Sequence, residues 1–115
     1  MNREEMMVEC AVNALQNKMA KNVVSLHVGA ATIITDYFVL ATGTNKSQMD
    51  AMIDGVQEEM RAAGYELVTR EGHSQGGWVL LDYGDIVVHI FDTEMRDFYA
   101  LDSTWRGVDK RTWSD

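Results

Sequence analysis

The chain has 115 residues, and its 18 acidic and 10 basic side chains give a formal net charge of −8 at pH 7. This length predicts one domain with a single hydrophobic core. No apolar run approaches the roughly 20 residues of a membrane span, and the opening MNREEMMVEC lacks the apolar stretch of a secretory signal, so we expect a cytoplasmic protein that binds no membrane. Cys10 is the one cysteine, which excludes an intrachain disulfide and a CxxC metal site.

The acidic balance also restricts the partner. A protein that binds nucleic acid neutralises phosphates with Lys and Arg, whereas the longest basic run here is the pair Lys110-Arg111. Little or no direct binding to RNA or DNA is therefore expected. Because opposite potentials speed encounter and orient two molecules, the charge favours a basic protein as partner.

The first predicted element is a helix over residues 4–21. Asn2 followed by Glu5 matches a capping box at its start, and Asn22 suits its far end. One apolar stripe at three- and four-residue steps supports the helix: Val8, Ala11, Val12, Leu15 and Met19. The alternating segment VVSLHV, residues 23–28, then predicts a half-buried strand.

The middle of the chain predicts a strand and a second long helix. A connection over 29–35 leads into a β-branched and aromatic strand at about 37–42. A helix follows at about 46–63, with Asn45 and Gln48 as its capping signal and Gly64 as its end.

The remaining elements are shorter. Tyr65 to Thr69 is predicted as a third strand, the polar REGHSQGG (70–77) as a loop, and 78–91 as a hairpin. Asp92 caps a short helix, TEMRDFYAL, before a polar tail at 106–115 that follows the domain of residues 1–105. The order predicts an α/β (α+β) fold with a single mixed sheet of about five strands and helices mainly on one face.

Few residues are arranged for catalysis. ATGTNKS (41–47) opens a helix after a strand but lacks the GxxxxGK[ST] spacing of a phosphate-binding loop, so it is interpreted as a helix cap. His27, His73 and His89 show no metal-ligand spacing, and no serine lies in a GxSxG context. We therefore expect no catalytic nucleophile, no metal and no cofactor.

The stretch DYGD at the tip of the hairpin permits two interpretations. Asp82 and Asp85 side by side would be suited to sharing a divalent cation. The same spacing also suits a tight turn, because Gly84 accepts positive φ. If Tyr83-Gly84 is a two-residue turn, Asp82 faces Asp85, whereas a three-residue turn with a glycine bulge slips the pairing by one.

In either register the two hairpin strands are apolar on both faces. One face packs on the helices, and the other requires a cover from more of the chain, a second copy or a foreign partner. Trp78, Tyr83 and Tyr99 belong to the aromatic classes that are enriched at interface hot spots. No third acid or basic phosphate clamp is placed nearby in the sequence, so the pattern favours a binding surface over a catalytic pair.

Three segments resemble the ribosomal silencing factor family, also called Iojap-like proteins. They are TDYFVLATGT (35–44), GGWVLLDYGDIVVHIF (76–91) and RDFYALDSTW (96–105), and the resemblance covers residues 4–105. The sequence departs from the family pattern at Asn45, where a serine is common, and at Asp102, where a glutamate is usual.

The resemblance implies a fold similar to nucleotidyltransferases without their catalytic residues. It also implies a translational repressor that binds the large ribosomal subunit through ribosomal protein L-fourteen and sterically blocks joining of the small subunit. The alternative is a metal-dependent nucleotidyltransferase or phosphohydrolase that uses Asp82 and Asp85. A homodimer of the free protein, in which the apolar sheet faces bury each other, is also considered.

The predicted partner surface centres on the hairpin. Trp78, Leu80 and Val87 are expected as desolvated anchors, and Asp82, Tyr83 and Asp85 as a polar rim that meets Lys or Arg. The family pattern adds Arg96, Tyr99 and Trp105, although Tyr99 and Trp105 are also suited to folding the last helix onto the sheet. His89 is expected either in the core or at the contact.

Overall fold

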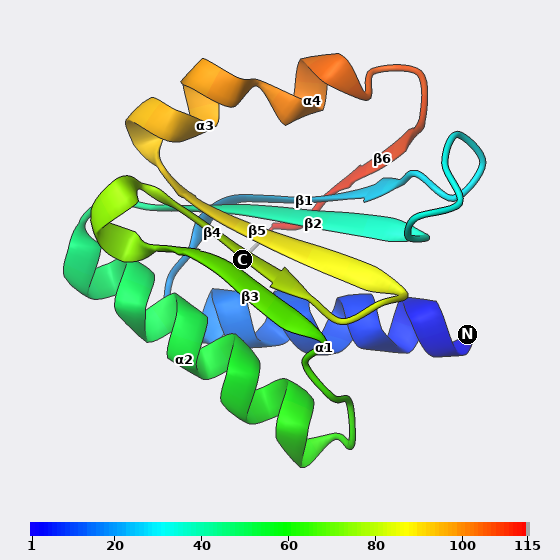
Figure 1. Ribbon diagram of the computed structural model, residues 1–115, viewed down its shortest axis with the longest axis horizontal. Coiled ribbons are helices and arrows are strands. Elements are labelled where there is room, and N and C mark those ends of the chain that lie inside the picture. Colours follow the sequence, from blue (N-terminus) through cyan, green and yellow to red (C-terminus); the bar gives the residue numbers. More distant parts are fainter. Residues whose placement is uncertain (115) are drawn as a thin grey trace.

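The computed structural model describes residues 1–114 and contains one six-stranded mixed sheet with helices on both faces (Figure 1). The strand order is β3-β4-β5-β2-β1-β6. The pair β2 (Tyr37–Gly43) and β5 (Ile86–Asp92) is parallel, and the other neighbouring strands are antiparallel. The predicted fold class is confirmed, with one strand more than expected.

Helix α1 (Arg3–Asn17) begins with the predicted capping box, in which Asn2 Oδ1 accepts from the Glu5 amide at 2.8 Å and Glu5 Oε1 accepts from the Asn2 amide at 3.0 Å. The helix ends earlier than predicted, because Met19 adopts a φ of 61° that closes its last turn. Asn22 is therefore not a helix end. It lies within β1 (Lys21–His27), with a φ of 52°, at an irregularity in the pairing with β2.

Helix α2 (Lys46–Ala62) begins at Asn45, whose Oδ1 accepts from the Gln48 amide at 2.8 Å, and Gly64 follows its end with a φ of 90°. The Gln48 side chain does not complete a capping box. Its amide nitrogen donates to the carbonyls of Lys18 and Met19 at 3.1 and 2.9 Å. The start of α2 is thereby joined to the end of α1.

The third strand was predicted at the wrong place. Residues 65–68 are not a strand, and Tyr65 and Leu67 pack against the core. Strand β3 (Thr69–His73) comes instead from the segment predicted as a polar loop, and a 3₁₀ turn, η1 (Ser74–Gly76), follows it. All five β3 residues are exposed at the sheet edge, so the strand carries no apolar alternation that a sequence pattern could reveal.

The hairpin of β4 (Trp78–Asp82) and β5 is confirmed, but its register is neither of the two considered. Trp78 pairs with Phe91 and Asp82 pairs with Val87. Asp82 therefore does not face Asp85. The turn lies one residue later than expected because Asp82 Oδ1 accepts from the Gly84 amide at 2.7 Å and Gly84 takes a φ of 84°.

The two faces of the sheet bear different covers (Figure 1). Helices α1 and α2 pack on one face and enclose the larger hydrophobic core. Helices α3 (Thr93–Tyr99) and α4 (Leu101–Thr104) cross the other face, over a smaller core of Val24, Leu26, Val28, Leu40 and Phe91. The two long helices therefore lie on one face, as predicted, and the short helices α3 and α4 cover part of the second face.

The segment predicted as a polar tail contains a strand. Strand β6 (Asp109–Thr112) pairs antiparallel with β1, and Trp113 packs against the larger core. The indole nitrogen of Trp113 donates to Ser25 Oγ at 2.9 Å. Because both faces of β1 are covered, its residues 23–26 are all buried, and the prediction of a half-buried strand was wrong. Within residues 1–114, no helix has the length and apolar content for a membrane span.

Candidate partner-binding surface

The second face of the sheet carries a cluster of aromatic rings at its β4 end. Alternation along β4 and β5 places on this face six residues, which we call the Trp78 face: Trp78, Leu80, Asp82, Val87, His89 and Phe91. The Trp78 ring lies 4.2 Å from Tyr99 of α3 and 5.3 Å from Phe91, centre to centre. Its indole nitrogen donates to His89 Nδ1 at 3.1 Å.

Part of this surface remains open to solvent. Trp78, Leu80 and Asp82 are half-buried, and Tyr99 is 42% exposed. A shallow pocket of about 160 Å³ lies between Trp78, Leu80 and the edge strand residues Glu71 and Gly72. The accessible surface is therefore aromatic at its centre and acidic at its edge.

Phe98 extends the aromatic surface and was not predicted as a contact residue. It is 75% exposed and stands edge-on to Tyr99 at 5.1 Å. A largely exposed phenylalanine beside a half-exposed tyrosine is unusual for a structural role, since large apolar surfaces are normally buried. The sequence carried one signal: Phe98 is the aromatic residue next to Tyr99 in TEMRDFYAL.

Two predicted contact residues lie inside the protein. Tyr83 is 6% exposed and belongs to the larger core, on the face that α1 and α2 cover. It cannot form the predicted polar rim, and burial raises the pKa of its hydroxyl to about 12. Val87 shares the face of Trp78 but is only 6% exposed, so it supports the surface from below and is not an exposed anchor.

Arg96 makes contacts within the chain. Its Nε and Nη2 both reach the Asp102 carboxylate at 3.1 Å, and its Nη1 donates to Thr42 Oγ1 at 2.9 Å and to the Asn22 carbonyl at 3.0 Å. Burial opposes ionisation of Asp102, but hydrogen bonds and the charge of Arg96 outweigh it and lower the pKa of that carboxyl. With 10% of its side chain exposed, Arg96 fastens α3 and α4 to the sheet. Trp105 packs edge-on against Phe38 in the same layer.

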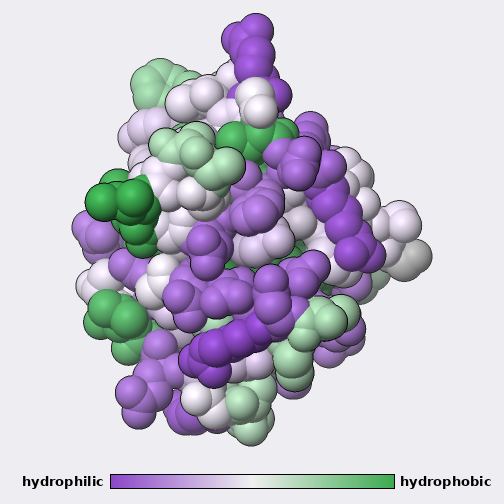
Figure 2. Space-filling view, turned by 90° about the vertical axis from the view of Figure 1, so that its right-hand side faces the viewer, coloured by the Kyte–Doolittle hydropathy of each residue, from purple (hydrophilic) through white to green (hydrophobic). Residues whose placement is uncertain are grey.

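The turn aspartates are not a pair. Asp82 bonds the turn backbone, whereas the Asp85 carboxylate lies 3.7 Å from Arg3 Nε and close to Glu4 and Asp36. Oxygens of these last three acids lie within 4.8 Å of one another, and Asp82 is not among them. Figure 2 looks onto this end of the molecule and shows a mostly hydrophilic surface with scattered hydrophobic residues. The structure therefore does not assemble the Asp82–Asp85 site of the enzyme alternative.

His89 is 4% exposed, and burial lowers its pKa to about 4. The ring is therefore neutral at ordinary pH and serves as a hydrogen-bond acceptor for Trp78.

The loop ATGTNKS, interpreted as a helix cap, forms the end of β2 and the cap of α2 as predicted.

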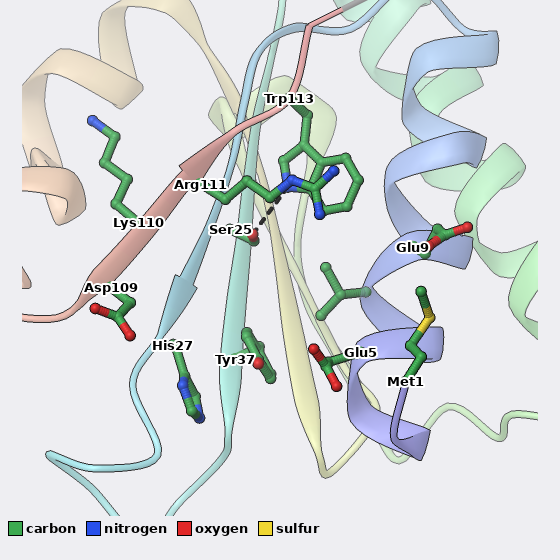
Figure 3. Close-up of a pocket in the computed structure, with 11 residues that line it drawn as sticks. Met1, Glu5, Glu9, Ser25, His27, Tyr37, Asp109, Lys110, Arg111 and Trp113 are labelled. Atoms are coloured by element: carbon green, nitrogen blue, oxygen red, sulfur yellow. Dashed lines mark hydrogen bonds between the residues drawn. The ribbon is translucent and has the colours of Figure 1, made fainter.

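A larger pocket of about 220 Å³ lies on the opposite face, between α1 and the strands β1 and β6 (Figure 3). His27 stacks on Tyr37 at 4.5 Å, and the Arg111 guanidinium lies 3.5 Å above the Trp113 ring. Burial and nearby carboxylates raise the pKa of Tyr37. Acidic and basic side chains both line the pocket, and the chain's own Arg111 already covers the indole, so these walls do not select one class of ligand.

Fold and surface together define a small α/β protein with an aromatic, acid-edged face beside an open sheet edge. A family model described as "Ribosomal silencing factor during starvation" matches residues 1–115. The chain belongs to this family.

Individual relatives agree with the family match. The protein named ribosomal silencing factor RsfS of Chromobacterium violaceum is 35% identical over 97 residues, which cover 84% of this chain and 80% of the relative. A crystal structure of a protein from the same organism superposes with a TM-score of 0.87 at 30% identity and covers 100% of this chain and 95% of that one. A mouse protein named mitochondrial assembly of ribosomal large subunit protein 1 is 26% identical over 101 residues, which cover 85% of this chain and 44% of the relative.

Proposed function

We propose that this protein represses translation by binding the large ribosomal subunit through ribosomal protein L-fourteen and thereby blocking the small subunit from joining. Family membership supports the proposal, as do the names of the relatives, which describe silencing of the ribosome and assembly of its large subunit. The observation that carries it is the half-exposed Trp78, held in an aromatic cluster beside solvent-exposed Tyr99 and Phe98.

The aromatic centre is suited to supply the binding energy. Trp and Tyr dominate interface hot spots because they bury large areas while few side-chain rotations are lost. Trp78, Leu80, Tyr99 and Phe98 are accessible without rearrangement, whereas Tyr83, Val87, His89 and Arg96 are held inside the fold. We therefore restrict the proposed contact to the accessible residues.

The acidic edge is suited to a basic partner. Asp82 and Glu71 border the aromatic centre, and the whole chain carries a net charge of −8. Carboxylates at the rim of an interface attract Lys and Arg of the partner and orient the encounter. The same charge repels the phosphates of ribosomal RNA, so contact with protein is favoured over contact with RNA.

The repression we propose is steric and requires no catalysis. The molecule measures 33 × 32 × 27 Å, and a body of this size on the joining face would hold the two subunits apart.

The protein would act in the cytoplasm. When the protein is not bound to a ribosomal subunit, a second copy of it would cover the same aromatic face in a homodimer. Because the proposed role needs neither metal nor nucleotide, isothermal titration with Mg²⁺ and ATP should give no binding heat.

Sedimentation with purified ribosomal subunits tests the proposal. The wild-type protein should cosediment with large subunits and reduce their joining to small subunits. Trp78→Ala should abolish both effects while leaving the protein folded. Ile34→Ala is the matched control, since Ile34 is 81% exposed in the β1–β2 connection, outside the Trp78 face. Retained cosedimentation of Trp78→Ala at ordinary salt would contradict the proposed surface.

A further inference from the structure

The orientation of Trp78 depends on one polar contact to a buried ring. Trp78 is the first residue of β4 and is half-buried, so its side chain is only partly confined by packing. Its indole nitrogen donates to Nδ1 of His89 at 3.1 Å. The ring of Tyr99 lies against the indole, with 4.2 Å between the two ring centres. The hydrogen bond is directional, so it selects one indole orientation where stacking alone permits several.

His89 itself is fixed in position. Its side chain is 4% exposed, and its ring stands edge-on to Phe38 at 4.8 Å with an interplanar angle of 78°. Strand pairing places His89 opposite Leu80 in the middle of the β4–β5 ladder. A buried interior ring therefore fixes a half-buried ring, to which stacking on Tyr99 and Phe91 alone would leave several orientations.

The hydrogen bond also has a cost in stability. Because Nδ1 accepts a hydrogen bond from the indole N–H, the neutral imidazole carries its own proton on Nε2. This Nε2 is buried and has no hydrogen-bond partner among residues 1–114. A buried donor without an acceptor destabilises the fold, and a leucine at the same place would not carry that penalty. Core stability alone therefore does not account for a histidine here.

We propose that His89 is a positioning residue, which holds the Trp78 indole in the orientation that meets the ribosomal partner. The inference rests on the proposed function, since it assigns His89 a role in the same contact. A side chain that is ordered before binding loses less conformational freedom on association, so the complex is tighter. His89 acts through Trp78 and does not touch the partner.

The test combines a binding measurement with a spectroscopic one. In the free wild-type protein, hydrogen exchange of the Trp78 indole N–H, followed by ¹⁵N NMR, should be slow. His89→Leu should make this exchange fast and weaken binding to large subunits on the order of tenfold, the effect of losing one ordering hydrogen bond. Its thermal stability should equal or exceed that of the wild type. His89→Asn, which places an oxygen near the position of Nδ1, should restore slow exchange and most of the affinity.

Ser25→Ala is the matched control. It removes the acceptor of the Trp113 indole nitrogen, which is the same kind of bond on the opposite face, and should leave the affinity unchanged. Wild-type affinity of His89→Leu would overturn the inference, as would fast exchange in the wild type. Failure of His89→Leu to fold would overturn it too, because the histidine would then serve the core. Absence of binding by the wild type, or unchanged binding by Trp78→Ala, would instead overturn the proposed function.

Discussion

Gly77 connects the 3₁₀ turn η1 to Trp78, and its backbone permits no side chain. Its φ is +82°, a region that L residues with a side chain rarely adopt. A Cβ atom there would lie 2.6 Å from Asp92 Oδ2 and 2.8 Å from Cγ of Met95. Asp92 is the cap of α3, since its Oδ1 accepts from the Met95 amide. A side chain at Gly77 would therefore disturb both the start of β4 and the start of α3.

We expect Gly77→Ala to lower the free energy of unfolding by about 2–3 kcal/mol, the sum of backbone strain and displacement of the α3 cap. Urea denaturation measures this. Gly107→Ala is the control, because a methyl group at Gly107 would meet no other atom within 4 Å, and it should stay within about 0.5 kcal/mol of wild type. Equal stability of the two variants would contradict the expectation.

His89 should make the fold sensitive to mild acid. Burial lowers its pKa from 6.5 to about 4. Below pH 6.5, His89 therefore binds a proton in the unfolded chain but stays neutral in the folded chain. Above pH 6.5 the neutral His89 leaves the free energy of unfolding at its full value. As the pH falls from 6.5 toward 4, that free energy decreases by about 3 kcal/mol in total. Denaturation curves between these pH values should show the loss in the wild type but not in His89→Leu. The prediction would be refuted if the free energy of unfolding fell by the same amount in both proteins over this pH range.

At the scale of elements, α3 and α4 form a cover that is held by few contacts. Neither helix has a fully buried residue, and α4 contains only four residues. Arg96 supplies the main polar attachment, because one guanidinium joins Asp102 of α4 to Thr42 of β2 and to the Asn22 carbonyl in β1. The irregularity at Asn22, which the sequence suggested as a helix end, thus provides an acceptor for this attachment.

Arg96→Ala should free this cover and lower the free energy of unfolding by about 2–3 kcal/mol. This is less than for a fully buried ion pair, because Asp102 keeps 28% of its side chain exposed. Amide hydrogen exchange should become faster in α3, α4 and β6 while α1 and α2 remain protected. Lys46→Ala is the control, since its bond to Asp50 is exposed and contributes little. Unchanged exchange in α3 and α4 would show that packing alone holds the cover.

For the whole molecule, charge should govern how fast the proposed complex forms. The surface beside Trp78 is acidic and the chain is acidic overall, so association with a basic partner should slow as salt rises. Asp82→Asn removes one rim charge and retains the oxygen that accepts from the Gly84 amide.

At low salt, Asp82→Asn should associate with large subunits roughly twofold to fivefold more slowly than wild type, with a weaker salt dependence. Stopped-flow measurements at several ionic strengths test this. Asp54→Asn, on the exposed side of α2, removes the same charge from the opposite face. If both variants slow association equally, net charge and not the rim accounts for the effect.

Local chemistry made several elements predictable from the sequence alone. The caps at Asn2, Asn45 and Asp92 each bond an amide three residues along. The DYGD turn between two apolar runs identified the hairpin of residues 78–91, although not its register. Such signals are confined to a few neighbouring residues, so no knowledge of the rest of the chain is needed.

Features that depend on distant partners become visible only in the three-dimensional structure. Strand β3 is polar and exists because β4 offers it an edge. Tyr83 is buried because α1 and α2 cover the face to which it points. Arg96 is engaged by residues 54 and 74 positions away. The same holds for the half-covered Trp78. A residue's own neighbours determine its helix or strand, whereas long-range packing determines which side chains remain at the surface for a partner.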